Sequence, residues 1–143
     1  MLMKKKLHKC SFFNDYIFFN LDMRGRKETG NPILDKTLAL SVMIVKFCDQ
    51  LNTDNKRDIA KQLLRSGTSI GANIREAQNP ESNADFIHKF KIASKEIKET
   101  EYWLDIIEVC YEKYNIEDIS KLLNEVAKIT NAIITTMKSK LKN

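Results

Sequence analysis

The chain has 143 residues, of which 43% are hydrophobic and 30% are charged, a composition typical of one globular domain and not of a disordered or fibrous protein. No run of 18 apolar residues occurs, so the sequence predicts neither a membrane-spanning helix nor a membrane partner. The net charge is +5, but residues 1–30 hold seven Lys/Arg against three Asp/Glu, which leaves 17 against 16 in residues 31–143. Because the body of the chain is nearly neutral, its overall basicity is no argument for nucleic-acid binding.

The three cysteines are Cys10, Cys48 and Cys110. Their number is odd and they lie far apart, which argues against a disulfide framework and against a zinc site. Two of them, Cys48 and Cys110, fall on apolar positions of expected helices. We therefore expect reduced thiols in a cytoplasmic protein.

Residues 1–31 differ in character from the rest of the chain. Three lysines precede an apolar stretch, as in a signal peptide, but Asn14 and Asp15 interrupt that stretch and no small-residue cleavage pattern follows. The aromatic residues here are Phe12, Phe13, Tyr16, Phe18 and Phe19. The sequence predicts a flexible extension over residues 1–31 and a domain over residues 32–143, with Met23 as an alternative start of the protein.

Helical patterns begin at Pro32, a residue suited to the first turn of a helix. The first helix buries a wide apolar face and is expected to end near residue 51. A short polar connection then offers Asp54 or Asn55 as the N-cap of a second helix, which is expected over about residues 56–77.

The third helix is expected to begin after Ser82, which caps it in a capping-box variant with Asp85, and to reach about residue 111. Its apolar seam steps alternately by four and three residues over four heptads, which indicates packing between helices. This seam comprises Phe86, Phe90, Ala93, Ile97, Thr100, Leu104, Ile107 and Tyr111. The fourth helix has its own seam and ends among lysines, as suits the helix dipole. The fourth-helix seam comprises Ile119, Leu122, Val126, Ile129, Ile133, Met137 and Leu141.

No segment shows the alternation typical of a β-strand. Four amphipathic helices joined by short connections instead predict an all-α fold, an antiparallel up-down-up-down four-helix bundle. The flexible extension would precede this bundle.

The second helix contains a stretch of small and polar residues that are poor helix formers. They are Ser66, Gly67, Thr68, Ser69, Gly71 and Asn73. Each glycine costs about 1 kcal/mol of helix stability relative to alanine, so something other than propensity must hold the helix together here. We expect close approach of another helix, with Ser69 and Asn73 hydrogen-bonding across the contact; the alternative is that these residues serve tight packing alone.

Basic residues form stripes on the expected outer faces of the second and third helices. They are Arg57, Lys61, Arg65 and Arg75, followed by Lys91, Lys95 and Lys98. Together the stripes could contact phosphates, or each could simply be a solvated face. An acidic patch runs from Glu99 to Asp118 and is expected at the same end of the bundle as Lys56, where it would pair within or between subunits.

Extra apolar strips flank the seams of the second and third helices and favour self-association. The proposed interface residues are Leu64, Gly67, Gly71, Ile92, Trp103 and Ile106. The alternative is that wide apolar faces fill a thick core.

Residues for catalysis are scarce. The two histidines, His8 and His88, are far apart, and residues 67–71 lack the lysine ending of a phosphate loop. Ser69, Asn73 and Glu76 could meet Glu99 and Glu101 at a carboxylate metal site, but the Glu-x-x-His pairs of bundle metal sites are absent. We therefore favour a structural hydrogen-bonded network and expect no catalytic residue, no metal and no cofactor.

The run R-S-G-T-S-I-G-A-N-I-R-E-A at residues 65–77, followed by D-F-I-H-K-F-K-I-A-S-K-E-I-K-E-T-E-Y-W-L at 85–104, resembles the bacterial four-helix-bundle family encoded in intervening sequences of 23S rRNA genes. The resemblance covers about residues 32–141 and implies a ring-forming bundle, often a homopentamer, without known catalysis. In this family's motifs, Ser69, Asn73 and Glu76 match S-x-x-x-N-x-x-E, and Glu99 and Glu101 match the paired glutamates. A related branch is the accessory variability protein of diversity-generating retroelements, a basic pentamer that binds nucleic acid; the nearly neutral body of this chain departs from it.

Two functional hypotheses follow. The first is a non-catalytic oligomer that binds RNA or DNA through the seven basic residues named above. The second is a protein-protein scaffold without a nucleic-acid ligand, whose basic stripe binds an acidic protein partner or an adjacent subunit.

Overall fold

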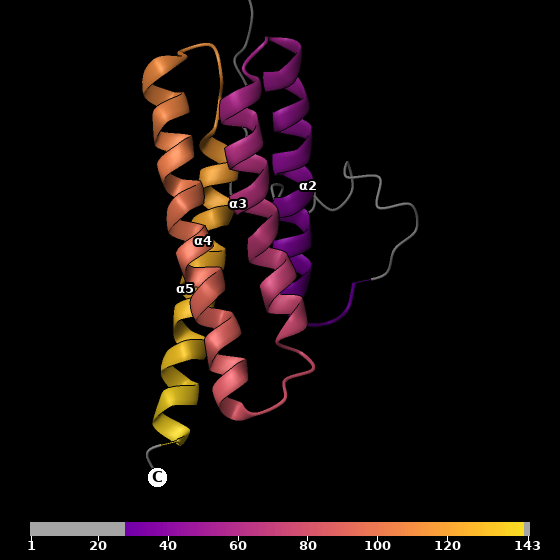
Figure 1. Cartoon of the computed structure of the whole chain (residues 1–143), viewed down its shortest axis with the longest axis vertical. Helices are drawn as coiled ribbons and strands as arrows, with labels where there is room; N and C mark the ends of the chain where they lie inside the picture. Colours follow the sequence, from indigo (N-terminus) through magenta and orange to yellow (C-terminus); the bar gives the residue numbers. More distant parts are fainter. Residues whose placement is uncertain (1–27, 142–143) are drawn as a thin grey trace, which may run out of the picture.

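The computed structural model describes residues 28–141. This part of the chain forms four α-helices and contains no β-strand: α2 (Pro32–Thr53), α3 (Arg57–Glu76), α4 (Asn83–Cys110) and α5 (Glu117–Lys140). Successive helices run in opposite directions, each packs on the next, and α5 packs back against α2 (Figure 1). The predicted all-α up-down-up-down bundle is confirmed. The predictions for residues 1–27, including the alternative start, lie outside the described residues.

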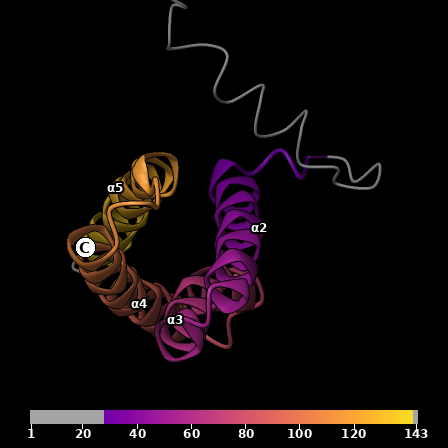
Figure 2. The same cartoon turned by 90° about the horizontal axis from the view of Figure 1, so that it is seen from above.

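Seen from above, the helices follow one another around the bundle in chain order, and α2 and α5 stand apart at the open side of the arc (Figure 2). These two helices are nevertheless joined by an ion pair between Lys36 Nζ and Glu125 Oε2, 2.7 Å apart. Among the described helices, none is both long and apolar enough to cross a bilayer.

One of the two predicted helix caps is observed, and the other is not. The hydroxyl of Ser82 accepts a hydrogen bond from the backbone N–H of Asp85 at 3.0 Å, as predicted. The predicted cap of α3 is wrong, because that helix begins after Lys56 without a side-chain cap. Neither predicted residue caps this helix. Asn55 takes up a left-handed backbone conformation with a φ of 60°, and the carboxylate of Asp54 accepts a hydrogen bond from the Tyr114 hydroxyl at 2.6 Å.

The small residues of α3 lie within one continuous helix because α2 approaches it closely. Gly67 is buried beneath Ile44 of α2, and a Cβ atom at Gly67 would collide with the end of that side chain. The predicted close approach is therefore confirmed. The predicted hydrogen bonds across the contact are wrong, because the amide of Asn73 donates within its own helix to the carbonyl oxygen (2.9 Å) and hydroxyl (3.2 Å) of Ser69.

Most of the predicted α4 seam is buried, whereas the predicted α5 seam is buried as far as Val126 and only partly buried beyond it, where Ile129 and Ile133 still pack against the core. Six of the eight α4 seam residues are buried: Phe90, Ala93, Ile97, Thr100, Leu104 and Ile107. In α5 the buried face moves to Thr130 and Ile134, whereas Ile129, Ile133 and Met137 are only half-buried and Leu141 is 51% exposed.

The reason is the relative length of α5 and α2. Lys36, which pairs with Glu125, lies four residues from the start of α2, whereas α5 continues for 15 residues beyond Glu125. At about 1.5 Å per residue, roughly 16 Å of α5 therefore extends past the beginning of α2. This extension forms the lower end of the molecule in Figure 1.

The two cysteines within the described residues are free thiols, as predicted. The Cys48 thiol is buried and donates a hydrogen bond to the carbonyl of Ala60 at 3.3 Å. Burial, with a smaller contribution from Asp49, raises the pKa of this thiol to about 11. Cys110 is exposed at the end of α4.

Candidate nucleic-acid interface

The basic stripe of α3 is only partly available to a ligand. Arg57, Lys61 and Arg75 are exposed, but the guanidinium of Arg65 is paired with the carboxylate of Glu99 on α4. The hydrogen bond and charge of Glu99 raise the pKa of Arg65, and the same contact lowers the pKa of Glu99. We therefore withdraw Arg65 from the predicted phosphate contacts, because binding a phosphate there would break this ion pair.

The α4 stripe is more accessible. Lys98 donates to Glu101 at 2.7 Å, but its side chain remains 75% exposed, so this pair is weak and easily rearranged. Lys91 and Lys95 are exposed and have no carboxylate partner among residues 28–141.

Ion pairs between α3 and α4 show how the two predicted stripes are turned. On α4, Lys89 and Glu99 face α3, where they pair with Glu76 and Arg65. At 100° per residue, Lys91 and Lys98 turn toward the α5 side of α4, whereas Lys95 lies on the outer face, about 40° from Glu99. Arg75 lies beside α2, where it lines a hollow of about 140 Å³ with Leu38 and Ser41. That both stripes contact the same phosphates stays a prediction.

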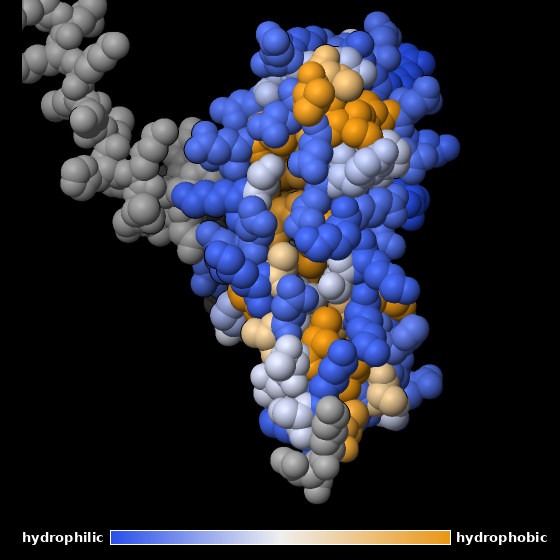
Figure 3. All heavy atoms as spheres, turned by 90° about the vertical axis from the view of Figure 1, so that its left-hand side faces the viewer, coloured by the Kyte–Doolittle hydropathy of each residue, from blue (hydrophilic) through white to orange (hydrophobic). Residues whose placement is uncertain are grey.

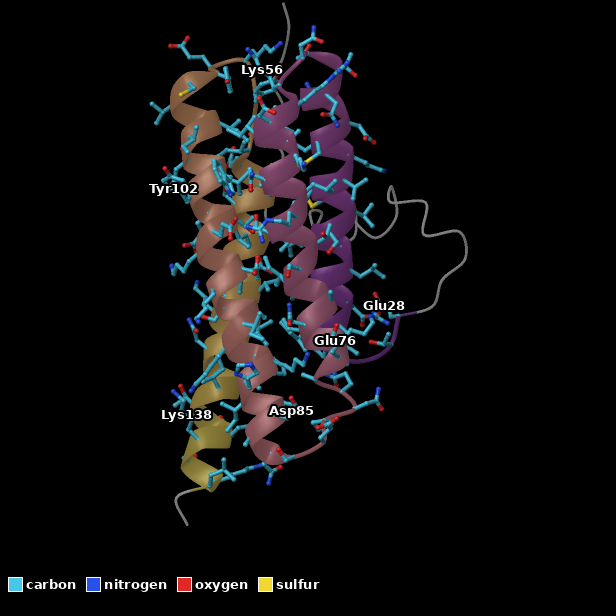
Figure 4. All side chains as sticks on the ribbon, in the orientation of Figure 1. Glu28, Lys56, Glu76, Asp85, Tyr102 and Lys138 are labelled. Atoms are coloured by element: carbon cyan, nitrogen blue, oxygen red, sulfur yellow. The ribbon has the colours of Figure 1, made fainter. Side chains whose placement is uncertain are left out.

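The structure brings the α4 lysines beside lysines of α5. Between these helices lies a hollow of about 340 Å³ lined by Glu101, Leu104, Asp105, Ser120, Leu123 and Asn124. Since the helices are antiparallel, this register places Lys98 and Lys91 level with about residues 128 and 135. We call the resulting surface the lysine face; it comprises Lys91, Lys95, Lys98, Lys128 and Lys138, all of them exposed. Figure 4 shows Lys138 projecting outward from the lower end of α5.

Four of the five residues of the lysine face lie in stretches of sequence without carboxylates, and Lys98 is the exception. No Asp or Glu occurs in residues 86–95 or 126–141. Sequence reasoning missed the α5 lysines because it explained them by the helix dipole, although the absence of acidic residues from residues 126–141 was a usable signal.

The upper half of α4 and the beginning of α5 are rich in acidic residues. Its carboxylates belong to Glu101, Asp105, Glu108, Glu112, Glu117 and Asp118. Lys56 Nζ lies 4.6 Å from the ring centre of Tyr111, which confirms that the acidic patch and Lys56 share one end of the bundle. Charge is therefore segregated along α4 and α5, with lysines below and carboxylates above.

The residues of the predicted network do not converge on one point. Asn73 bonds Ser69, Glu76 pairs with Lys89 at 2.6 Å, and Glu101 pairs with Lys98. Glu99 accepts from Arg65 and from the indole N–H of Trp103. Within residues 28–141, no three His, Cys, Asp or Glu side chains are grouped to hold a metal ion. These side chains form local hydrogen bonds and ion pairs on α3 and α4.

The predicted interface residues fall on two faces, with one exception. Gly67 is buried against Ile44 of its own chain, so its assignment to an interface between subunits is wrong. Leu64 is 37% exposed beside α2, and Gly71 lines the hollow there. The α4 members, Ile92, Trp103 and Ile106, are half-buried. Figure 3 shows apolar surface continuing between hydrophilic side chains along the α4 and α5 side of the molecule.

The family model for the 23S rRNA-intervening sequence protein matches residues 31–135. The chain belongs to this family. A solved structure of a protein of unknown function from the S23 ribosomal protein family of Bacteroides thetaiotaomicron is 42% identical to this 23S rRNA-intervening sequence protein, with a TM-score of 0.69. The match covers 73% of this chain and 96% of that chain. No curated protein matches. The family resemblance seen in the sequence is confirmed, and residues 1–30 lie outside the matched range.

Proposed function

We propose that this protein is a non-catalytic, RNA-binding accessory protein that holds RNA phosphates on the lysine face. The observation that carries the proposal is the gathering of exposed lysines of α4 and α5 over two stretches without carboxylates, residues 86–95 and 126–141. Nearer the middle of the bundle, Lys98 pairs with Glu101, and Lys128 lines a hollow with Asp105, Glu108, Glu117 and Glu125. The printed names of the family and of its relative, which refer to ribosomal RNA and to a ribosomal protein family, support the choice of RNA.

The spacing of the lysines suits a phosphate chain. Side chains three or four residues apart on a helix lie about 5–6 Å from one another, so Lys91, Lys95 and Lys98 present a continuous row of ammonium groups. The long lysine stems adapt to phosphates without a fixed geometry, which favours binding with little sequence preference. The neutral net charge of the body does not oppose this function, because many of the carboxylates of α4 and α5, such as Asp105, Glu108, Glu117 and Asp118, lie toward the other end.

The test is fluorescence anisotropy of a labelled single-stranded RNA at several salt concentrations. If five lysines contact phosphates, the slope of log K against log salt is about −3.5, so affinity falls roughly 100-fold between 50 and 200 mM salt. The variant Lys91→Gln, Lys95→Gln, Lys138→Gln should flatten this slope.

A matched control removes three charges from the stripe on α3: Arg57→Gln, Lys61→Gln, Arg75→Gln. It should leave affinity and slope nearly unchanged. Equal losses in both triple variants would show that only overall charge matters, and binding insensitive to salt would contradict the proposal outright.

A second candidate function is a scaffold that assembles with itself, as the family resemblance implies for a homopentamer. It is favoured by the apolar side chains on two separate faces, with Val45 and Leu64 41% and 37% exposed on one and Trp103 half-buried on the other. Light scattering of the full chain tests it: Leu64→Glu should lower the particle mass, whereas the exposed Gln50→Glu should not. A monomeric wild type would eliminate this candidate.

A further inference from the structure

One exposed aromatic side chain continues the row of lysines on α4. Tyr102 is 58% exposed, and it is the one aromatic residue among the exposed large apolar side chains of residues 28–141. At about 100° per residue, it lies about 20° from Lys91 and Lys95 around the helix and about 40° from Lys98. Figure 4 shows Tyr102 on the outer side of α4, on the same side of the molecule as Lys138. The three α4 lysines and the ring of Tyr102 therefore lie along one face of the helix.

The ring of Tyr102 is supported by its neighbour in the chain. Its centre lies 5.2 Å from that of the Trp103 ring, and the two ring planes meet at 62°. Trp103 is half-buried, and its indole N–H donates a hydrogen bond at 3.3 Å to Glu99, which also accepts from Arg65 of α3. Because Trp103 is anchored in this way, ordering Tyr102 against a ligand costs less conformational freedom than ordering an unsupported surface side chain.

The charges around Tyr102 change sign along α4. Lys98 precedes it by four residues, and Asp105 follows it by three. Glu99 and Glu101 are each paired with a basic side chain, whereas Asp105 lines the hollows beside α5. Asp105 would repel a phosphate placed over Tyr102, but it would not repel the face of an uncharged base. The position of Tyr102 therefore suits a base better than a phosphate.

We propose that Tyr102 stacks on one unpaired RNA base while the phosphates that lead to this base lie along Lys98, Lys95 and Lys91. Every nucleobase has a π-face, so an aromatic ring beside a basic row binds single strands with little sequence preference. Inside a duplex the bases stack on one another and present no free face to a side chain. The inference rests on the RNA-binding function proposed above and adds its substrate class, which is single-stranded RNA.

Fluorescence anisotropy with the full chain tests the stacking. The probes are a short labelled single-stranded RNA without self-complementarity and the duplex that it forms with its complement. Tyr102→Ala removes the ring, and Tyr102→Phe keeps the ring without its hydroxyl. Val109→Ala is the matched control, because Val109 is 82% exposed about 20° from Tyr102 on the same face of α4 but offers no π-surface.

Tyr102→Ala should weaken binding of the single strand by roughly 5- to 100-fold, the range that follows from losing one stacked base. It should leave the slope of log K against log salt unchanged, because stacking releases no counterions. It should also leave binding of the duplex unchanged, since the duplex has no base to stack on the ring. Tyr102→Phe and Val109→Ala should bind both probes as the wild type does.

Single-strand binding by Tyr102→Ala that equals that of the wild type, with the salt slope intact, would overturn the stacking and leave the lysine face in place. Equal losses for the single strand and the duplex would also overturn it. So would a loss in Tyr102→Phe as large as that in Tyr102→Ala, because the hydroxyl and not the ring would then carry the effect. A wild type that binds neither probe would overturn both proposals.

Discussion

Replacing Gly67 by alanine tests whether contact with α2 holds the small-residue stretch in a helix. In an exposed helix this change would stabilise the protein by about 1 kcal/mol. Here the added methyl group collides with the end of the Ile44 side chain and lies 3.1 Å from its Cγ2 atom. Since Ile44 is fully buried, it cannot move aside freely, and overpacking of this kind costs about 1–3 kcal/mol. The net expectation is a destabilisation of about 1 kcal/mol, or about 4 °C in Tm.

Urea unfolding followed by circular dichroism measures the change, and a second substitution identifies its cause. Ile44→Val removes the colliding Cδ1 atom and costs about 1 kcal/mol alone. In the double variant this loss is offset by the gain in helix propensity, so its stability should return to about that of the wild type. Gly71→Ala is the matched control, because its nearest neighbour, Ser41 Oγ, is 3.3 Å away and the expected change is smaller. If Gly67→Ala alone stabilised the protein by about 1 kcal/mol, the close approach of α2 and α3 would be refuted.

Two further predictions concern polar contacts. The pKa of Asp54 lies below 3.8 in the folded protein, mainly because its carboxylate accepts a hydrogen bond from Lys113. This contact therefore stabilises the fold above pH 3.8, and the stabilisation is lost as the pH falls through the pKa of Asp54 in the folded protein. Asp54→Asn should therefore flatten the acid limb of a stability-against-pH curve below pH 3.8, and an unchanged limb would argue against the contact. Thr100→Val removes the hydroxyl that lies 3.1 Å from the buried Ser66 hydroxyl and should cost about 1–2 kcal/mol in urea unfolding. Adding Ser66→Ala should recover part of this loss, and strictly additive losses would indicate that the two hydroxyls do not interact.

Helix positions followed from local rules that need no tertiary information. Apolar spacing and the Ser82 cap placed α4 within about one residue of its observed ends, because periodicity and capping act over a few neighbouring residues. The close approach at Gly67 was also predictable, since poor helix formers inside a helix need a compensating contact. The family was also recognisable from residues 65–77 and 85–104, because its motifs consist of residues that lie close together in the sequence.

The candidate site was less predictable, because it depends on the partner that each side chain meets. Nothing local to Arg65 reveals that Glu99, 34 residues away, pairs with it. Likewise, a helical pattern marks Leu141 as apolar but does not say whether a neighbouring helix is long enough to cover it, and it is 51% exposed.

The sequence by itself determined that this protein is a four-helix bundle of the 23S rRNA-intervening sequence family, since periodicity, caps and motifs are properties of consecutive residues. Only the tertiary structure decided which lysines share a surface and which apolar residues stay exposed. These outcomes depend on the register and relative lengths of the packed helices, which bring Lys91 beside α5 and leave Leu141 beyond the start of α2.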